Sequence, residues 1–285
     1  MKKLKRHAKF YLAILFATVL VFGTVGVAMA GNLEVDDAGG NEDEIIFGSQ
    51  TKEDGYIGVE MPESIDENAI ETDYYIESVE QFNNFQAISK TNDFAGITVH
   101  LAANVSLDEN FVGIGSDEVP FAGTFDGHGY AITKMSSTAN GLFVAVEGAT
   151  IQKLVIGSAK VAASEVVASV GILANTANGA TVDRVIISGS KLTAPAETLA
   201  GGMFGKVTGA VTITDSTVRR LIVNTTGEAS AVGGFVGNAE ATVTTENCAV
   251  VNSYAKGTES VFVNCTVLNG TVNGAEGTFC EILQK

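Results

Sequence analysis

Residues 202–218 read GMFGKVTGAVTITDSTV, and the same pattern returns along the chain at a period near 31 residues. The pattern opens on Gly-x-(Phe/Leu) and, eight to ten residues later, carries a mostly apolar triplet at offsets 0, +3 and +5. Its opening elements are Gly141-Leu142-Phe143, Gly171-Ile172-Leu173, Gly202-Met203-Phe204 and Gly233-Gly234-Phe235. The triplets are Ile151/Leu154/Ile156, Val182/Val185/Ile187, Ile213/Ser216/Val218 and Thr245/Cys248/Val250. Such a period, built from short strands, predicts stacked coils that bury their faces against their neighbours.

The spacing inside each triplet predicts a bend. Side chains alternate between the two faces of a strand, so offsets +3 and +5 share a face, whereas 0 and +3 share one only if the chain turns between them. We therefore expect a corner between the first and second members of every triplet. The opening elements are expected to stack their last residues into one internal column: Phe143, Leu173, Phe204 and Phe235. The glycine two positions earlier is needed where a Cβ would collide with the next coil.

The fold class that follows is all-β, a parallel β-helix or solenoid. Small and β-branched residues supply most of the apolar content, as expected for strands rather than for a helix bundle. Because the repeat is long for one β-helix coil, each coil is expected to carry an additional loop. Two candidates for this loop are Gly157-Ser158-Ala159 and Ala194-Pro195-Ala196.

Both ends of such a stack need covering, because stacked coils leave open edges only there. Ser78 with Gln81 fits a capping box. The apolar residues that follow recur at near-helical spacing: Val79, Phe82, Phe85 and Ile88. One short capping helix, 78–90, is therefore predicted at the N-terminal end of the repeats. A shortened last copy within 262–283, with the triplet Phe262/Cys265/Val267, is expected to close the other end.

Residues 1–30 fit a secretion signal. They contain five bases and no acid, a mostly apolar stretch, and Ala28-Met29-Ala30 with small residues at the −3 and −1 positions of a signal-peptidase site. A retained membrane anchor is the alternative, since the apolar run is nearly long enough to span a bilayer. The pattern favours cleavage, so the protein is expected to be extracellular, secreted or associated with the cell surface, without membrane contact after cleavage.

Residues 31–75 have a different composition from the repeats. Between Leu33 and Glu80 there are 16 acidic residues and one basic residue, Lys52. Low apolar density and uncompensated charge disfavour a packed core, so a flexible acidic spacer is predicted ahead of a repeat domain at 76–285. A calcium site is the alternative, but no Asp-x-Asp-x-Asp-Gly loop occurs. Removal of residues 31–74 is accordingly expected to leave thermal unfolding unchanged.

The overall charge restricts the partners. The chain has Lys+Arg 17 against Asp+Glu 33, a formal net charge of −16. Nucleic acids and anionic membrane surfaces would repel such a polyanion at long range. Nucleic acid is therefore not an expected partner.

The segment 121–132, FAGTFDGHGYAI, resembles the F-x-G-T-F-D-G-x-G-x-x-I segment of bacterial surface proteins that carry GLUG-type repeats. The Gly-x-Phe elements are similar to GLUG motifs, with Gly233-Gly234-Phe235-Val236-Gly237 the best copy and Leu173 a departure from the aromatic. The resemblance extends over about 75–267. It implies a right-handed parallel β-helix in an exported, adhesin-like protein, but such repeats specify a scaffold and not an activity.

Few residues suggest chemistry. His100 lies in an alternating strand and His128 in a glycine-rich turn, with no metal-ligand spacing between them. Asp126 precedes Gly127, which is ordinary turn chemistry. No His-Glu-x-x-His, Gly-x-Ser-x-Gly or phosphate-binding loop occurs. We therefore expect no catalytic residue, no metal site and no cofactor, and the sequence does not identify the binding residues.

The enzyme alternative depends on charged residues in neighbouring repeats. Some β-helices cleave polysaccharides, and such a site needs carboxylates, or a carboxylate with Arg or Lys, on one face of adjacent coils. The best candidates are Asp183-Arg184 and Asp215 with Arg219-Arg220. Asp183 lies at offset +1 and Asp215 at +2, so the two are not in register, and solvated charges on an outer sheet explain them without catalysis.

The three cysteines have a structural explanation. Cys248 and Cys265 occupy the +3 position that Leu154 and Val185 fill in earlier copies, so both are expected to be buried free thiols. Export permits a disulfide, and which of Cys248, Cys265 and Cys280 would form one is left open.

The function predicted is adhesion, binding or display at the cell surface, without catalysis. Glycans and surface proteins of host or neighbouring cells are the expected partners, because repeat proteins bind through an extended face with many weak contacts. The alternatives are a polysaccharide-active enzyme and a structural element of a surface assembly.

Overall fold

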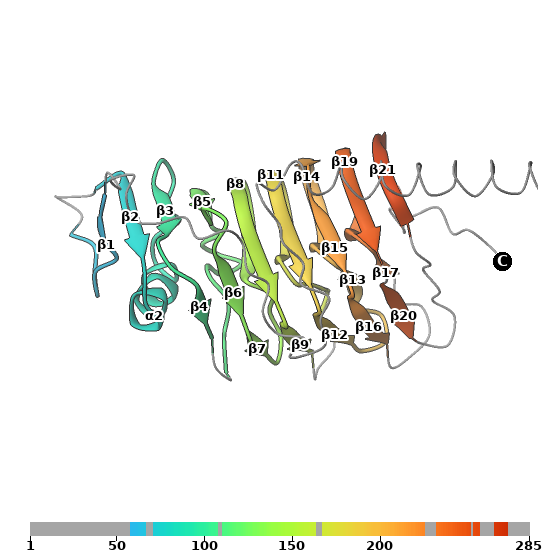
Figure 1. The fold of residues 1–285 in the computed structure, drawn as a ribbon, viewed down its shortest axis with the longest axis horizontal. Coiled ribbons are helices and arrows are strands. Elements are labelled where there is room, and N and C mark those ends of the chain that lie inside the picture. Colours follow the sequence, from blue (N-terminus) through green and yellow to red (C-terminus); the bar gives the residue numbers. More distant parts are fainter. Residues whose placement is uncertain are drawn as a thin grey trace, which may run out of the picture. The chain divides into compact units, whose positions relative to one another are not determined.

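The computed structural model describes residues 58–66, 71–107, 110–163, 167–225, 232–251, 253–256 and 265–272. The described chain is mostly β, a parallel β-solenoid with one short helix, as the repeats predicted (Figure 1). The expected signal segment, residues 31–57 of the expected spacer, and Cys280 lie outside the described residues. No helix in the described ranges combines the length and apolarity that crossing a membrane requires.

Within the described residues, three sheets run along the solenoid, and the largest has thirteen strands. Its strands are β1 (Val59–Glu60), β2 (Asp73–Ile76), β3 (Thr98–Leu101), β4 (Val105–Ser106), β5 (Thr124–Asp126), β6 (Ala131–Thr133), β8 (Phe143–Gly157), β11 (Ala174–Ser188), β14 (Phe204–Thr214), β15 (Thr217–Arg219), β18 (Val236–Ala239), β19 (Val243–Val251) and β21 (Cys265–Val272). The second contains β7 (Ser136–Ser137), β9 (Lys160–Ala162), β12 (Lys191–Ala194), β16 (Ile222–Thr225) and β20 (Tyr254–Lys256). The third contains β10 (Ser169–Gly171), β13 (Leu199–Gly201) and β17 (Val232–Gly233).

The coils lengthen along the chain. Phe125 pairs with Ile151, 26 positions later, whereas Ile151 pairs with Val182, 31 positions later. We call residues 71–149 the early coils and 150–251 the later coils. In Figure 1 their strands follow one another in chain order from β2 to β19.

The additional length of the later coils lies on one side. Ser137 and Phe143 are six positions apart, whereas their partners Val161 and Ala174 are thirteen apart and enclose β10. The expected loop at Ala194-Pro195-Ala196 falls in this region, between β12 and β13. The prediction for Gly157-Ser158-Ala159 was wrong, because those residues form a short corner between β8 and β9, with Ser158 at φ 53°.

The corner predicted inside each triplet is confirmed. In every copy, the residue immediately before the second triplet member has a left-handed backbone: Lys153 (φ 49°), Arg184 (φ 53°), Asp215 (φ 48°) and Asn247 (φ 53°). This conformation reverses the alternation of side chains, so offsets 0 and +3 both point inward. All four first members and all four second members are accordingly buried.

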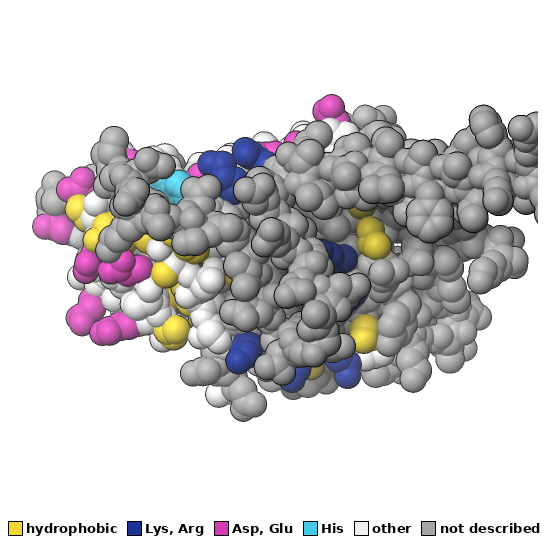
Figure 2. Space-filling view, viewed as in Figure 1, with side chains coloured by type: hydrophobic (Ala, Val, Ile, Leu, Met, Phe, Trp, Pro, Cys, Tyr) yellow, Lys and Arg dark blue, Asp and Glu magenta, His cyan; other side chains and the backbone are white. Residues whose placement is uncertain are grey.

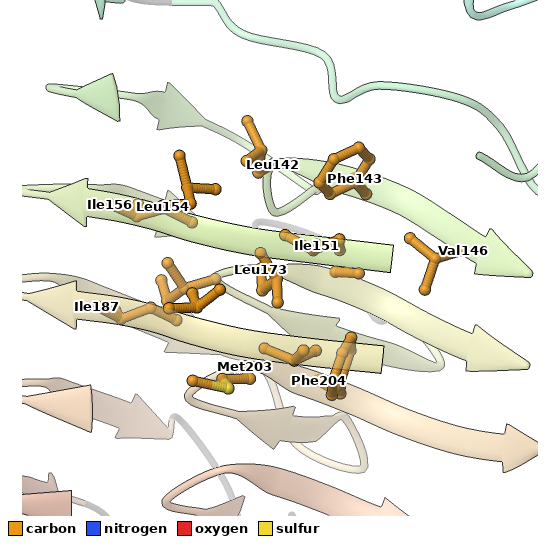
Figure 3. Packing of buried hydrophobic residues seen from close by; sticks show 14 of the residues in the cluster. Leu142, Phe143, Val146, Ile151, Leu154, Ile156, Leu173, Ile187, Met203 and Phe204 are labelled. Atoms are coloured by element: carbon orange, nitrogen blue, oxygen red, sulfur yellow. The ribbon is translucent and has the colours of Figure 1, made fainter. Parts of the chain in front are cut away.

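The single internal column predicted from the Gly-x-(Phe/Leu) elements was wrong by one position. Phe143 and Phe204 both pair with Ala174, and Phe204 pairs with Val236. Leu173 and Phe235 precede these partners by one residue, so they align with Leu142 and Met203. Figure 3 shows the two columns side by side, with Phe143 and Phe204 in one and Leu142, Leu173 and Met203 in the other. The cause is a changing coil length, since successive steps from Phe143 are 31, 30 and 32 positions.

The role expected for the repeat glycines is confirmed by close backbone contact between coils. A Cβ on Gly141 would overlap the carbonyl oxygen of Gly171, and one on Gly202 would overlap that of Gly234. Any larger residue would therefore force two coils apart.

Helix α2 (Val79–Ile88) confirms the predicted helix, although it ends two residues earlier than expected. The Ser78 hydroxyl accepts a hydrogen bond from the Gln81 backbone N–H (3.2 Å), and the Gln81 side chain accepts one from the Glu77 N–H (2.7 Å). The buried face of α2 fills the interior of the early coils with Phe82, Phe85 and Ile88. Aromatic ring contacts continue from Phe82 and Phe85 through Phe94, Phe111, Phe121 and Phe125 to Phe143.

Folded structure begins earlier than position 76. Strand β1 pairs in parallel with β2, matching Val59 with Tyr74, and lies at the end of the largest sheet beyond β2. Met61 and Tyr74 are each 2% exposed. Paired strands therefore begin before the expected boundary at position 76, and Met61 and Tyr74 supply buried apolar side chains within an otherwise acidic stretch.

The last repeat copy does not form another parallel coil. Strand β21 runs antiparallel to β19, which places Leu268 opposite Cys248 and Cys265 opposite Val250. Cys265 therefore pairs with Val250 and not with Cys248, although both cysteines occupy the +3 position of their copies, because the direction of the strand is reversed. Cys248 is buried and free, as expected. The β21 strand does lie against the last parallel strand of this sheet.

Candidate functional site

A row of threonines follows the outer face of the largest sheet. Thr98 pairs with Thr124, and the same register continues through the neighbouring strands to Thr150, Thr181, Thr212 and Thr244. All six are at least partly exposed. Since paired parallel strands lie about 4.8 Å apart, the hydroxyls repeat at nearly constant intervals. We call these six residues the threonine row.

A second polar row lies two positions further along each strand, on the same face. In register, it contains Tyr75, His100, Asp126, Gln152, Asp183, Thr214 and Glu246. Hydrogen bonds join some neighbours: the Gln152 amide donates to Asp126 Oδ2 (2.7 Å), and the Thr214 hydroxyl donates to Asp183 Oδ1 (3.0 Å). We call these seven residues the polar row.

Sequence reasoning missed both rows because it followed the buried positions. A signal was present, since a threonine immediately precedes each triplet at Thr150, Thr181, Thr212 and Thr244. A residue before an inward-facing position points outward, so these threonines had to share the outer face.

The two histidines meet at the polar row of the early coils. His100 Nδ1 lies 2.9 Å from His128 Nε2, and their ring centroids are 5.0 Å apart. The turn after β5 makes this contact. Asp126 Oδ1 accepts a hydrogen bond from the His128 N–H (2.9 Å), and His128 adopts φ 50°. The turn role predicted for Asp126 is thus confirmed, and the same turn brings His128 against His100.

Charged groups surround this pair. His100 Nε2 lies 3.0 Å from Asp73 Oδ1, and His128 Nε2 lies 3.8 Å from Asp126 Oδ2. Lys153 Nζ lies 3.1 Å from the same Asp126 oxygen, and Asp126 itself is only 5% exposed. Figure 2 shows histidine surface (cyan) on the outside of the molecule, near Lys or Arg side chains (dark blue).

The environment changes the pKa values of these groups. Burial alone would raise the pKa of Asp126, but the hydrogen bond from the His128 backbone and the charges of His128 and Lys153 outweigh it, so this pKa lies below its ordinary value. Burial lowers the pKa of His128. The hydrogen bond with His100 lowers the pKa of Asp73. The cluster therefore favours ionised carboxylates beside a neutral His128 imidazole at neutral pH.

The two histidines lack metal-ligand spacing in the sequence, but the fold brings them together. One ligand atom each from His100, Asp126 and His128 lies within 4.8 Å of the others. Neutral imidazole and carboxylate are groups that bind divalent transition metals. The three residues are thus a candidate metal site that we did not predict from the sequence.

The charged residues considered for catalysis are distributed over separate positions. Arg184 forms an ion pair with Asp183 (2.6 Å), and both side chains are partly exposed. Asp215 lies at a left-handed corner and, as expected, is out of register with Asp183, whose partner is Thr214.

The two arginines lie elsewhere on the coils. Arg219 pairs in register with Ser188, and both Arg219 (3.1 Å) and Arg220 (3.3 Å) donate to the Ser188 hydroxyl. In the described contacts these arginines therefore bind Ser188, and Asp183 binds Thr214 and Arg184.

The comparisons with known proteins assign this chain to no family. No family model matches the chain, and no curated protein matches it. A solved structure described as a "putative immunoglobulin A1 protease" from Bacteroides ovatus matches at 13% sequence identity with a TM-score of 0.39, covering 72% of this chain and 83% of that one. The resemblance to GLUG-type proteins was not matched by a family model and stays a prediction from the motifs.

Proposed function

We propose that this protein is an exported, surface-exposed binding protein whose outer sheet holds an extended glycan, without cleaving it. The observation that carries the proposal is the threonine row, in which hydroxyls recur in register on successive strands. The polar row beside it adds hydrogen-bond donors and acceptors along the same direction.

The chemistry of the two rows suits a polymer of hydroxyl groups. A threonine hydroxyl both donates and accepts, as a sugar hydroxyl does, so each strand can exchange a hydrogen bond with one part of an extended ligand. Individual exposed hydrogen bonds are weak, and repetition along one face adds their contributions. The net charge of −16 favours neutral or cationic glycans over anionic ones.

Export and a surface location belong to the proposal as well. They depend on the pattern of residues 1–30 and on the resemblance to surface proteins.

Native affinity electrophoresis of residues 31–285 through gels that contain different neutral polysaccharides tests the proposal. We expect retarded migration in at least one gel, without clearing of the polysaccharide. Replacement of Thr150, Thr181 and Thr212 by valine should abolish the retardation, because valine keeps the β-branched shape that suits a strand but removes the hydroxyl.

Thr193→Val is the matched control, since Thr193 is a partly exposed threonine in β12 of the second sheet. It should migrate like the unchanged protein. Unretarded migration of the unchanged protein in every gel would contradict glycan binding and direct attention to protein partners or self-assembly. Clearing around the band would instead indicate an enzyme.

A further inference from the structure

We propose that His100, His128 and Asp126 bind a divalent transition-metal ion, for which Zn²⁺ is the reference. Two imidazole nitrogens and one carboxylate oxygen are a ligand set that suits Zn²⁺ and its neighbours rather than Ca²⁺ or Mg²⁺, which prefer oxygen alone. His100 and Asp126 also belong to the polar row, but the threonine variants that test glycan binding leave all three proposed metal ligands unchanged.

The distances between the ligand atoms fit one ion. His100 Nδ1 and His128 Nε2 are 2.9 Å apart, and His128 Nε2 and Asp126 Oδ2 are 3.8 Å apart. A tetrahedral Zn²⁺ with bonds of about 2.0–2.1 Å holds its ligand atoms about 3.3 Å apart. These two distances lie on either side of this value, and all three ligand atoms lie within 4.8 Å of one another, so side-chain rotations within the cluster would bring them to one ion.

The second nitrogen of His100 has the partner that a metal-binding histidine requires. His100 Nε2 lies 3.0 Å from Asp73 Oδ1, and an ionised carboxylate can only accept. His100 Nε2 therefore carries the proton, and the lone pair of Nδ1 points to His128. A carboxylate behind a histidine in this manner fixes the tautomer and increases the basicity of the metal-facing nitrogen.

The backbone positions the three ligands before any ion arrives. His100 in β3 and Asp126 in β5 are register partners, so their side chains emerge side by side from neighbouring strands. The hydrogen bond from the His128 N–H to Asp126 holds the turn that carries the third ligand. Three partly or fully buried side chains on two coils therefore meet without large rearrangement.

Lys153 is the group that opposes metal binding. Its ammonium lies 3.1 Å from Asp126 Oδ2, where it neutralises the carboxylate that an ion would use. The Lys153 side chain is 36% exposed, so it can move into solvent when an ion takes its place. An ion must displace this cation, and removal of Lys153 should therefore strengthen binding.

Isothermal titration of residues 31–285 with Zn²⁺, and absorption spectroscopy with Co²⁺, test the proposal. The whole chain contains three histidines, and residues 31–285 retain only His100 and His128, so a histidine signature can come only from this pair. We expect one ion per chain, a Co²⁺ spectrum with nitrogen and oxygen ligands, and no competition from Ca²⁺. Zn²⁺ should also raise the unfolding temperature, because the ion binds the folded chain.

Three variants separate this site from adventitious binding. His128→Asn removes a ligand but tolerates the positive φ, and should weaken Zn²⁺ binding by about tenfold or more. Asp73→Asn should weaken it by roughly 10–100-fold through His100. Lys153→Asn should strengthen it, an outcome that a purely structural role for the cluster would not produce.

Asp183→Asn is the matched control, because Asp183 belongs to the polar row two strands beyond Asp126. It should leave Zn²⁺ affinity unchanged. The proposal is overturned if Zn²⁺ does not bind, if His128→Asn binds as tightly as the unchanged chain, or if Co²⁺ shows the charge-transfer band of a cysteine thiolate. Failure of polysaccharide retardation would leave these results unaffected.

Discussion

The early and later coils fill the same kind of interior with different side chains. In the early coils, α2 inserts Phe82 and Phe85 among rings from the following strands. In the later coils, the paired columns are mostly aliphatic, and glycines allow the backbones to touch. The early coils therefore depend on interlocking rings and the later coils on aliphatic columns, whereas glycines bring the backbones close in both, as Gly123 and Gly127 do in the early coils.

The largest effect should come from the ring cluster of the early coils. Phe85 is fully buried and contacts the rings of Phe82, Phe94, Phe121 and Phe125. Phe85→Ala should lower the free energy of unfolding by about 3–5 kcal/mol, measured by denaturant titration with circular dichroism.

Leu173→Ala supplies the comparison from the later coils, with an expected loss of about 2–5 kcal/mol. A loss at Phe85 that is clearly smaller than the loss at Leu173 would refute the idea that rings hold the early coils together.

Deletion of N-terminal residues shows where the folded structure begins. Deletion of residues 31–74 removes β1 and the buried side chains of Met61 and Tyr74. It should cost about 3 kcal/mol or more in unfolding free energy, since each such side chain contributes about 1.5–3 kcal/mol when fully buried. This replaces the expectation of no effect that the acidic composition suggested.

Deletion of residues 31–57 is the matched control, and thermal unfolding should not change. Equal unfolding temperatures for both truncated chains would show that β1 and Tyr74 contribute nothing to the fold.

Gly171 of the later coils should be less tolerant of a methyl group than Gly129 of the early coils. A Cβ on Gly171 would overlap the carbonyl oxygens of Ala174 and Met203, so Gly171→Ala should cost about 1–3 kcal/mol or more. Gly129→Ala should cost about 1–2 kcal/mol, because Gly129 has φ 85° but no atom within 4 Å of the added carbon. Urea titration measures both, and the reverse order would contradict close backbone packing in the later coils.

The smallest effect should be a pH dependence from the early coils. Burial lowers the pKa of His128 below its ordinary value of 6.5, so the unfolded chain binds the proton first as pH falls. The free energy of unfolding should therefore be fully retained above 6.5 and decrease as pH drops from there toward the lowered pKa.

A second loss should follow below 3.8, the ordinary value from which the pKa of Asp126 is lowered. Denaturant titrations between neutral and acidic pH measure both losses. His128→Asn should remove the first and reduce the second, because the charge of His128 also lowers the pKa of Asp126, whereas Asp183→Asn should preserve both. If the His128 variant loses the same unfolding free energy below pH 6.5 as the unchanged chain, that loss comes from another titrating group.

The sequence predicted the features that repeat locally. The corner residue in each triplet and the glycine contacts depend on spacing within one copy, and the capping box of α2 depends on neighbours along the chain. Each of these was visible as a short pattern with a direct steric or hydrogen-bonding cause.

The features that the sequence did not reveal depend on register between coils. A step of 30 rather than 31 positions shifts Phe204 relative to Leu173, and no single copy contains that information. His100 and His128 are 28 positions apart, and they meet because the left-handed turn at His128 returns the chain toward β3. The reversal of β21 likewise could not be read from its apolar triplet.

At the left-handed corners, a change of the exposed side chain is independent of any change in the buried side chains. The later coils carry Lys153, Arg184, Asp215 and Asn247 at this corner, so its charge varies while its backbone conformation is retained. A mutation there changes what one coil presents to solvent without altering the side chains that pack inside. A lineage of such proteins can therefore diversify its surface one coil at a time while the scaffold stays the same.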